Sequence, residues 1–320
     1  MPVNADKIHL WKTDIARSVD FYNEWFMQFA PKAYRETRVV RTKQVEDAFR
    51  QTSNLIDIAP QVLREFPAAL QMLRMATAPP IARDRLIGLA GVSKTLVNSM
   101  ESKGCVPPRF KAAQVDDELR KIGQIIARLA DEDILTWLEP RRVPSTVDLH
   151  RAATIIADRL CGAVADPIIR NAQEQRQLAT IKTWLESRGY TEATGAQRVT
   201  IEKMPPGTFA FRLSVQGKLV DGERTVKLPI DTVVMPKQAK RNELPLLIEA
   251  KSAGDFTNTN KRRKEEATKV AQLRSNYGKK VRFILFLCGY FDSGYLGYEA
   301  AEGIDWVWEH RVGDLAKFGV

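Results

Sequence analysis

The chain has 320 residues, of which 44% are apolar and 28% are charged, as in an ordinary soluble globular protein. Its net charge of +10 favours a polyanionic partner. No apolar run reaches the roughly 18 residues of a membrane helix, the start lacks a signal-peptide pattern, and the three cysteines have no disulfide or zinc spacing. These features predict a reduced, cytoplasmic protein of one or two domains.

Residues 1–165 show the periodicity of helices almost throughout. In the segment KTDIARSVDFYNEWFMQFA apolar residues recur every three or four positions, which predicts an amphipathic helix that ends before Pro31. Proline and glycine residues separate further predicted helices at 36–52, 60–77, 83–102, 112–138 and 146–162.

Two of these helices lie in the segment RDRLIGLAGVSKTLVNSMESKG, which has the rhythm of a helix-turn-helix motif around Gly91. The second helix would carry Lys94 and Asn98 toward DNA. Ordinary helical hairpins produce similar strings, so an unspecialised hairpin is the alternative. If the motif reads DNA, residues 1–165 hold a recognition function.

Residues 166–320 differ from the first half because strand patterns alternate with helical ones. After Pro167 a long helix is predicted to end at Gly189. Strands are predicted at 208–215, 225–235, 244–250, 281–290 and 305–310, helices at 260–277 and at the chain end, and a glycine-rich loop at 289–303. The fold class is therefore α+β or α/β, with a helical N-terminal region followed by a mixed β-sheet flanked by helices.

Charged side chains occur at the ends of two of these predicted strands. Asp231 follows Leu228-Pro229-Ile230, and Glu249 and Lys251 follow LPLLI. Because side chains alternate along a strand, Glu249 and Lys251 point to one face. Two carboxylates beside an ammonium predict a Mg²⁺ site, since this ion takes one or two protein carboxylates and fills its other positions with water and phosphate.

This pattern predicts a role for each of the three residues. Asp231 and Glu249 would hold the metal, and Lys251 would orient or deprotonate the attacking water and stabilise charge on the phosphate. The Glu-x-Lys triplet alone is weak, because Glu101-Ser102-Lys103 has the same form at the predicted end of a helix. A surface ion pair at a strand end is the alternative. The three histidines are far apart, which argues against a zinc or HNH-type site.

These residues resemble the PD-(D/E)xK nuclease superfamily. Pro229-Ile230-Asp231 stands where that pattern often has Pro-Asp, with one residue inserted, and Glu249-Ala250-Lys251 stands for (D/E)xK. The longer string IEAKSAGDFTNTNKRRKEEATK is similar to the core of the XamI-type family of type II restriction endonucleases, which also begin with a helical region. The resemblance covers the C-terminal half with specific motifs and the N-terminal half only in general character.

The resemblance implies a Mg²⁺-dependent enzyme that cuts double-stranded DNA at a short fixed sequence and leaves 5′-phosphates. Many such nucleases add a glutamate from the helix before the sheet, and Glu174 stands there; an exposed glutamate near a helix N-terminus is the alternative. Without the resemblance, composition and spacing predict only a metal-dependent enzyme that acts on a phosphate group.

The segment after Lys251 is strongly basic. Residues 240–282 hold twelve Lys and Arg against five Asp and Glu, so seven of the ten net positive charges lie there. Such residues position a duplex through its phosphates. Two alternatives are that Arg262 or Arg263 reads guanine edges and that the segment is a solvated helix face. The predicted DNA contacts are Asn258, Asn260, Lys261, Arg262, Arg263, Lys264 and Lys269.

The sequence therefore predicts a type II restriction endonuclease with a helical region at 1–165 and a nuclease core at 166–320. A palindromic site would match a homodimer, and a DNA methyltransferase encoded nearby would protect the host. Two alternatives stay open: a structure-specific repair or recombination nuclease of the same superfamily, and a non-catalytic helix-turn-helix DNA-binding protein.

Overall fold

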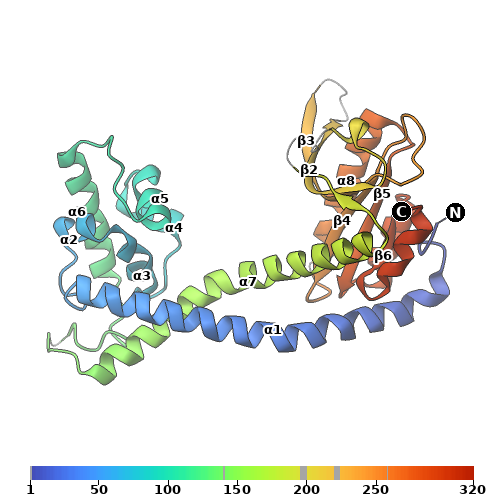
Figure 1. Cartoon of the computed structure of the whole chain (residues 1–320). Helices are drawn as coiled ribbons and strands as arrows, with labels where there is room; N and C mark the ends of the chain where they lie inside the picture. Colours follow the sequence, from blue (N-terminus) through green and yellow to red (C-terminus); the bar gives the residue numbers. More distant parts are fainter. Residues whose placement is uncertain (1, 140, 195–199, 220–223, 258) are drawn as a thin grey trace. The chain divides into compact units, whose positions relative to one another are not determined.

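The structure is a computed structural model that describes residues 2–139, 141–194, 200–219, 224–257 and 259–320 (Figure 1). For residues 163–166 and 259–263 it describes the backbone only. The chain forms two compact units, one of residues 30–168 and one that combines residues 1–29 with 169–320. We call them the helical unit and the sheet unit.

The helical unit consists of short helices, the last part of one long helix and the first part of another. Its members in chain order are part of α1 (Ile8–Gln51), α2 (Pro60–Glu65), η1 (Pro67–Ala69), α3 (Leu70–Met75), α4 (Arg83–Ala90), α5 (Lys94–Lys103), α6 (Ala112–Arg128) and part of α7 (Thr146–Ser187). Leu63, Leu73, Leu96, Leu119 and Trp137 are completely buried in one core. The helix predicted at 60–77 is divided into α2, η1 and α3, with Pro67 at the first break, and the helix predicted at 112–138 ends at Arg128.

The two long helices correct the sequence prediction. Pro31 lies inside α1 and Pro167 inside α7, whereas one helix was predicted to end before Pro31 and separate helices were predicted before and after Pro167. An internal proline removes one hydrogen bond and crowds the preceding turn, at a cost of about 3 kcal/mol. In α1, buried residues such as Tyr22 before Pro31 and Val45 after it hold the helix on both sides of the proline.

A six-stranded mixed sheet organises the sheet unit. Its strands are β1 (Thr191–Glu192), β2 (Thr208–Lys218), β3 (Thr225–Val234), β4 (Leu246–Ala253), β5 (Arg282–Gly289) and β6 (Asp305–Trp308), in spatial order β1-β2-β3-β4-β5-β6. The pairs β2–β3 and β3–β4 are antiparallel, and the pairs β1–β2, β4–β5 and β5–β6 are parallel. The predicted helical N-terminal region and mixed sheet are confirmed.

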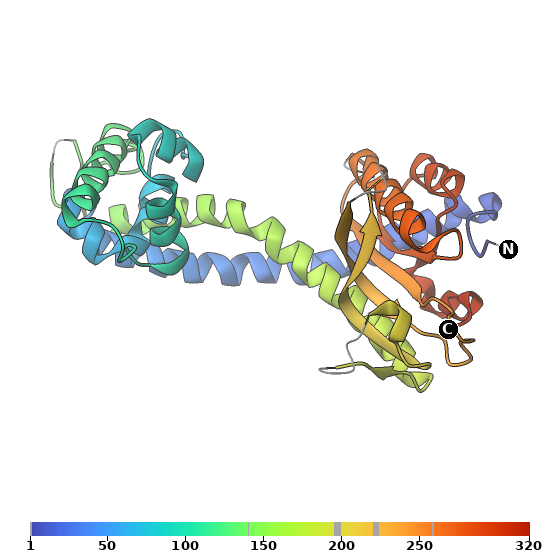
Figure 2. The same cartoon turned by 90° about the horizontal axis from the view of Figure 1, so that it is seen from above.

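Helices cover both faces of this sheet (Figure 2). One face packs against α8 (Thr259–Tyr277), α9 (Ser293–Ala301) and the start of α1, and the other against the end of α7 and η4 (Glu309–Phe318). The first half of β4 and nearly all of β5 are apolar on both sides, as expected of strands buried between two layers. A short helix η3 (Ile201–Lys203) precedes β2.

Residues 289–303 are not the loop that their glycines predicted. They contain helix α9, whose N-cap residue Asp292 accepts a hydrogen bond from the backbone N–H of Tyr295. The buried side chains of Tyr295 and Leu296 hold it against the sheet, and this burial outweighs the low helix propensity of glycine.

The first residues of the chain pack into the sheet unit. Backbone N–H groups of Val3, Asn4 and Ala5 donate to the carboxylate of Asp305 at the start of β6, and Trp11 makes an edge-on contact with Trp306. The compact unit around the sheet therefore includes residues 1–29, which a single division at residue 165 had placed with the helical region. No helix in the described part of the chain is both long and apolar enough to cross a membrane.

Candidate active site

Strands β3 and β4 separate at the point where the predicted site residues lie. Their ladder runs only from Thr232 to Val234, paired with Ile248 to Leu246. Just beyond it Asp231 accepts a 2.8 Å hydrogen bond from the backbone N–H of Ala250. Asp231 thus lies within β3 rather than at its end, and the separation of the strands leaves room for polar side chains.

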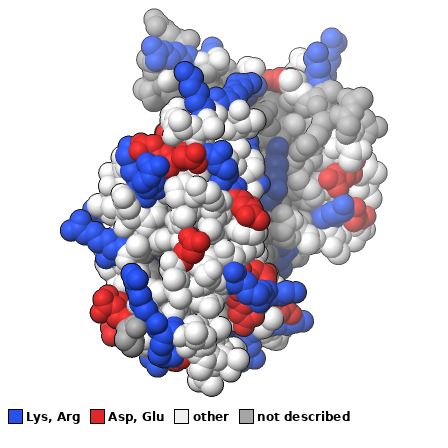
Figure 3. Space-filling view, turned by 90° about the vertical axis from the view of Figure 1, so that its left-hand side faces the viewer, with Lys and Arg blue, Asp and Glu red and all other residues white. Residues whose placement is uncertain are grey.

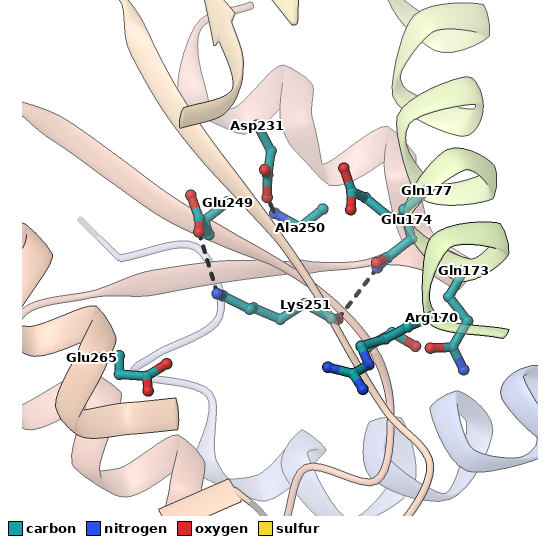
Figure 4. A pocket seen from close by; sticks show the side chains of 10 residues that line it. Arg170, Gln173, Glu174, Gln177, Asp231, Glu249, Ala250, Lys251 and Glu265 are labelled. Carbon is teal, nitrogen blue, oxygen red and sulfur yellow. Dashed lines mark hydrogen bonds and ion pairs between the residues drawn. The ribbon is translucent and has the colours of Figure 1, made fainter. Parts of the chain in front are cut away.

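A pocket of about 300 Å³ opens at this separation (Figure 4). Strands β3 and β4 line one side of it and helix α7 lines the other. Its lining residues are Arg170, Gln173, Glu174, Gln177, Asp231, Glu249, Ala250, Lys251, Ser252 and Glu265. The structure therefore brings Asp231, Glu249, Lys251 and Glu174 to one cavity.

Alternating charges connect the side chains of the pocket to helix α8. Lys251 Nζ lies 3.2 Å from Glu249 Oε1 and 3.1 Å from Glu266 Oε1. The same Glu249 oxygen lies 2.7 Å from Lys269 Nζ, which also donates to the backbone carbonyl of Pro229. Two acids and two lysines from β4 and α8 thus form one continuous ion-pair chain.

Burial and neighbouring charges shift the acid–base properties of the pocket. Burial, followed by the nearby carboxylate of Glu249, raises the pKa of Asp231 to about 6. Burial lowers the pKa of Lys251, but the carboxylates of Glu249 and Glu266 outweigh it and leave that pKa above its ordinary value. Lys251 is therefore an ammonium ion in this arrangement.

The residues present fit a divalent cation. Glu249 Oε2 is buried and has no hydrogen-bond partner among the described residues, which leaves one carboxylate oxygen ready for a ligand. The two carboxylates of Asp231 and Glu249 are the number that Mg²⁺ takes from a protein. Within the described ranges no group of three or more His, Cys, Asp or Glu forms a metal cage, and a Mg²⁺ site with water and phosphate ligands does not need one.

Helix α7 supplies polar side chains on the far wall of the pocket. Gln177 donates hydrogen bonds to the carbonyls of Lys251 and Phe286, and Gln173 donates to the hydroxyl of Tyr22. Glu174 lines the pocket and forms a 2.6 Å ion pair with Arg212. The sequence analysis singled out Glu174 on this helix but neither glutamine.

The predicted DNA contacts fall into three groups. Lys264 is exposed on α8, whereas Lys269 is mostly buried and forms an ion pair with Glu249, so its side chain is directed at a residue of the pocket rather than toward solvent. Asn258 and the side chains of Asn260, Lys261, Arg262 and Arg263 lie outside the described part of the structure. Lys94 and Asn98 lie on α5 in the helical unit.

Helices α4 and α5 are joined by a short turn, as expected both for a helix-turn-helix motif and for an ordinary helical hairpin. Three residues join them, and Gly91 among these adopts the left-handed conformation that suits glycine. Lys94 is exposed, while Asn98 accepts a 3.2 Å hydrogen bond from Arg83. On the face of the helical unit that Figure 3 shows, acidic and basic side chains are interspersed, so charge alone does not mark a DNA surface there.

Sequence reasoning missed Glu266, whose side chain is only 1% exposed. A signal was present, because Glu266 shares the spacing i, i+4, i+7 with the buried Val270 and Leu273 and hence one helix face. Its neighbours in KRRKEE made it look like part of a solvated charge run.

Comparison with known proteins identifies the family. The model of the XamI restriction endonuclease family matches residues 53–308. The chain is 52% identical over 317 residues to the Type II restriction enzyme SalI of Streptomyces albus G, and the match covers 99% of each protein. The chain therefore belongs to the XamI restriction endonuclease family and is a type II restriction enzyme.

A solved structure adds nothing to this assignment. Protein VC1899 from Vibrio cholerae aligns with 80% of this chain and 55% of its own, at 12% identity. The TM-score is 0.29, which carries no argument about fold or function.

Proposed function

We propose that this protein is a cytoplasmic, Mg²⁺-dependent enzyme of the PD-(D/E)xK type that hydrolyses double-stranded DNA at a fixed sequence and leaves 5′-phosphate ends. The observation that carries the proposal is the convergence of Asp231, Glu249 and Lys251 in one pocket. The name of the SalI relative, a type II restriction enzyme, supports the reaction class.

In this proposal Asp231 and Glu249 hold the metal. A bound Mg²⁺ supplies Lewis-acid neutralisation of the scissile phosphate and lowers the pKa of a coordinated water. Asp231 is kept in place by the Ala250 N–H, and Glu249 by its ion pairs with Lys251 and Lys269. Both carboxylates are therefore oriented before a ligand arrives, which is how a site gains from preorganisation.

Lys251 acts as a hydrogen-bond donor. Its raised pKa keeps it protonated, so it orients the attacking water and stabilises charge on the phosphate oxygens. Water attacks phosphorus in line, and the bond to the 3′-oxygen breaks. The cut strand is thereby divided into one fragment that ends in a 3′-hydroxyl and one that begins with a 5′-phosphate.

DNA binding belongs to two regions in this proposal. The basic segment 258–264, of which the structure describes the side chain of Lys264 only, contacts DNA phosphates. Helix α5 of the helical unit, with Lys94 and Asn98, lies in a groove. A C2 homodimer would place one pocket at each strand of a palindromic site, and a separate DNA methyltransferase would protect the host genome.

The test is incubation of the purified protein with phage DNA and Mg²⁺. Discrete bands that EDTA and Lys251→Ala abolish, and that Lys12→Ala at an exposed position of α1 leaves unchanged, support the proposal. End-labelling of the fragments identifies the 5′-phosphate. A smear or cutting only at DNA junctions would favour a repair nuclease, and retarded but uncut DNA a binding protein. Wild-type cleavage by both Asp231→Ala and Lys251→Ala would contradict the site.

A further inference from the structure

Helix α8 carries a buried carboxylate that the reaction described above does not use. Glu266 is 2% exposed as a residue, although its neighbours Lys264 and Glu265 are exposed. Burial raises its pKa, as expected for an acid removed from water. A carboxylate in such a place is costly unless a partner compensates for the lost hydration.

The partner of Glu266 is Lys251. The ammonium group of Lys251 lies between two carboxylates, 3.1 Å from Glu266 Oε1 and 3.2 Å from Glu249 Oε1. These carboxylates come from different elements, since Glu249 lies on β4 beside the lysine and Glu266 lies on α8. The lysine is thus held from two sides at nearly equal distances.

Helix α8 is firmly seated, which makes it a suitable anchor. Val270 and Leu273, one and two turns after Glu266, are completely buried against the sheet. Lys269, one turn after Glu266, reaches the other member of the pair, Glu249. One helix face therefore supplies a carboxylate, Glu266, to Lys251 and an ammonium group, Lys269, to Glu249.

The two anchors of Lys251 differ in what else they must do. Glu249 is shared with Lys269, and in the proposed reaction it also holds the metal. A carboxylate that binds a cation attracts a neighbouring ammonium less strongly, because its charge is neutralised. Glu266 does not hold the metal in this proposal. Its ion pair with Lys251 would therefore keep the ammonium group in place when Glu249 binds the metal.

We infer that Glu266 is a positioning residue that fixes the ammonium of Lys251 over the reacting phosphate. This inference rests on the proposed function, because it assigns Glu266 a role only through Lys251. Glu266 touches neither DNA nor metal in it.

The first test compares Glu266→Gln, which keeps the shape and removes the charge, with Glu266→Asp, which keeps the charge and shortens the side chain. Loss of the anchor should lower kcat about 10- to 100-fold in the glutamine variant, as for other misplaced catalytic groups. The aspartate variant should retain more activity than the glutamine variant. A purely structural role predicts the reverse order, because glutamine fills the space better.

Two further readouts separate positioning from metal binding. The KM for DNA and the Mg²⁺ concentration for half-maximal rate should stay as in the wild type. A raised Mg²⁺ requirement would make Glu266 a metal ligand and overturn the inference. Glu299→Gln, an equally buried acid on α9 outside the pocket lining, is the matched control and should cut normally.

The decisive measurement is a double-mutant cycle. In a Lys251→Ala background, whose residual rate is followed in long incubations with enzyme in excess over DNA, Glu266→Gln should cause no further loss of rate, because Glu266 acts only through the lysine. A further loss of tenfold or more would overturn the inference. Wild-type cleavage by Lys251→Ala alone would instead contradict the proposed function, so the two failures are distinguishable. Melting curves of all variants exclude unfolding as the cause of any loss.

Discussion

At the scale of single residues, the folded protein holds Asp231 where burial and the charge of Glu249 disfavour its ionised form. Its pKa in the folded protein, about 6, lies above the ordinary value near 3.8. The folded protein therefore binds this proton more tightly than the unfolded chain. In the metal-free protein this group makes the free energy of unfolding fall as pH rises from about 4 through 6.

We expect Asp231→Asn to stabilise the metal-free protein at pH 8 by up to about 3 kcal/mol, the equivalent of two pKa units. Near pH 3.5 the two proteins should be equally stable, because the wild-type acid is then neutral. Urea unfolding in EDTA at both pH values measures the difference. Asp20→Asn on the exposed face of α1 is the control, and an equal gain there would refute the explanation.

Lys269 lies closer to Glu249 than Lys251 does, at 2.7 Å against 3.2 Å, and helps to neutralise this carboxylate in the absence of metal. Lys269→Met should lower the free energy of unfolding in EDTA by about 2–4 kcal/mol, since a mostly buried ion pair loses one partner. Addition of Mg²⁺ should restore part of this loss, and more than it stabilises the wild type. Denaturant titrations with and without Mg²⁺ give the values.

A surface lysine provides the comparison for Lys269. Lys182 pairs with Glu192 at 2.7 Å on a more exposed site. Lys182→Met should cause a clearly smaller loss, with no response to Mg²⁺. If both variants behave alike, the ion pair at Glu249 has no special role.

The residues of the pocket were predictable to different degrees. Strand alternation put Glu249 and Lys251 on one face, and an apolar run before Asp231 placed it on a neighbouring strand. Glu266 and the inward direction of Lys269 were not predictable in this way. They depend on how α8 is rotated against the sheet, and the helix has charged residues all around its first turns.

At the scale of elements, proline was a misleading stop signal. Pro31 is exposed within α1 and leaves one backbone carbonyl of the preceding turn without its helical donor. The proline is visible in the local sequence. The burial that stabilises the helix on either side of it depends on packing partners far away along the chain. The strands were located better, because a continuous apolar run such as FILFLC is itself the product of burial on both sides.

Replacing Pro31 should therefore strengthen α1. We expect Pro31→Ala to raise the free energy of unfolding by about 1–3 kcal/mol, as the missing hydrogen bond is restored. Pro60 is the matched control, because it occupies the first turn of α2, where proline is favourable. Pro60→Ala should leave stability unchanged or lower it, and thermal melts of both variants decide the matter.

At the scale of the whole molecule, the two units have separate hydrophobic cores. Residues from Val45 to Leu160 form the core of the helical unit, and no member of it belongs to the two cores described around the sheet. The sequence predicted a division near residue 165 from the change of texture. It held no local signal that the first 29 residues return to the sheet, because that contact spans about 300 positions.

We expect residues 30–168 to fold when expressed alone. A fragment of this size with its own core should give a helical circular dichroism spectrum and one cooperative unfolding transition. Residues 169–320 alone should be unstable, because they lack Trp11 and the N-terminal contacts to Asp305. A molten helical fragment would contradict the assignment of separate cores.

The contact between residues 3–5 and Asp305 has a consequence for synthesis of the enzyme. At roughly 5–20 residues per second, the ribosome delivers Asp305 about 15–60 s after the residues that bind it. The helical unit can fold during this interval, while the N-terminal segment waits for its partner strand. The sheet unit is therefore completed late, and an unfinished chain lacks the framework of the proposed active site.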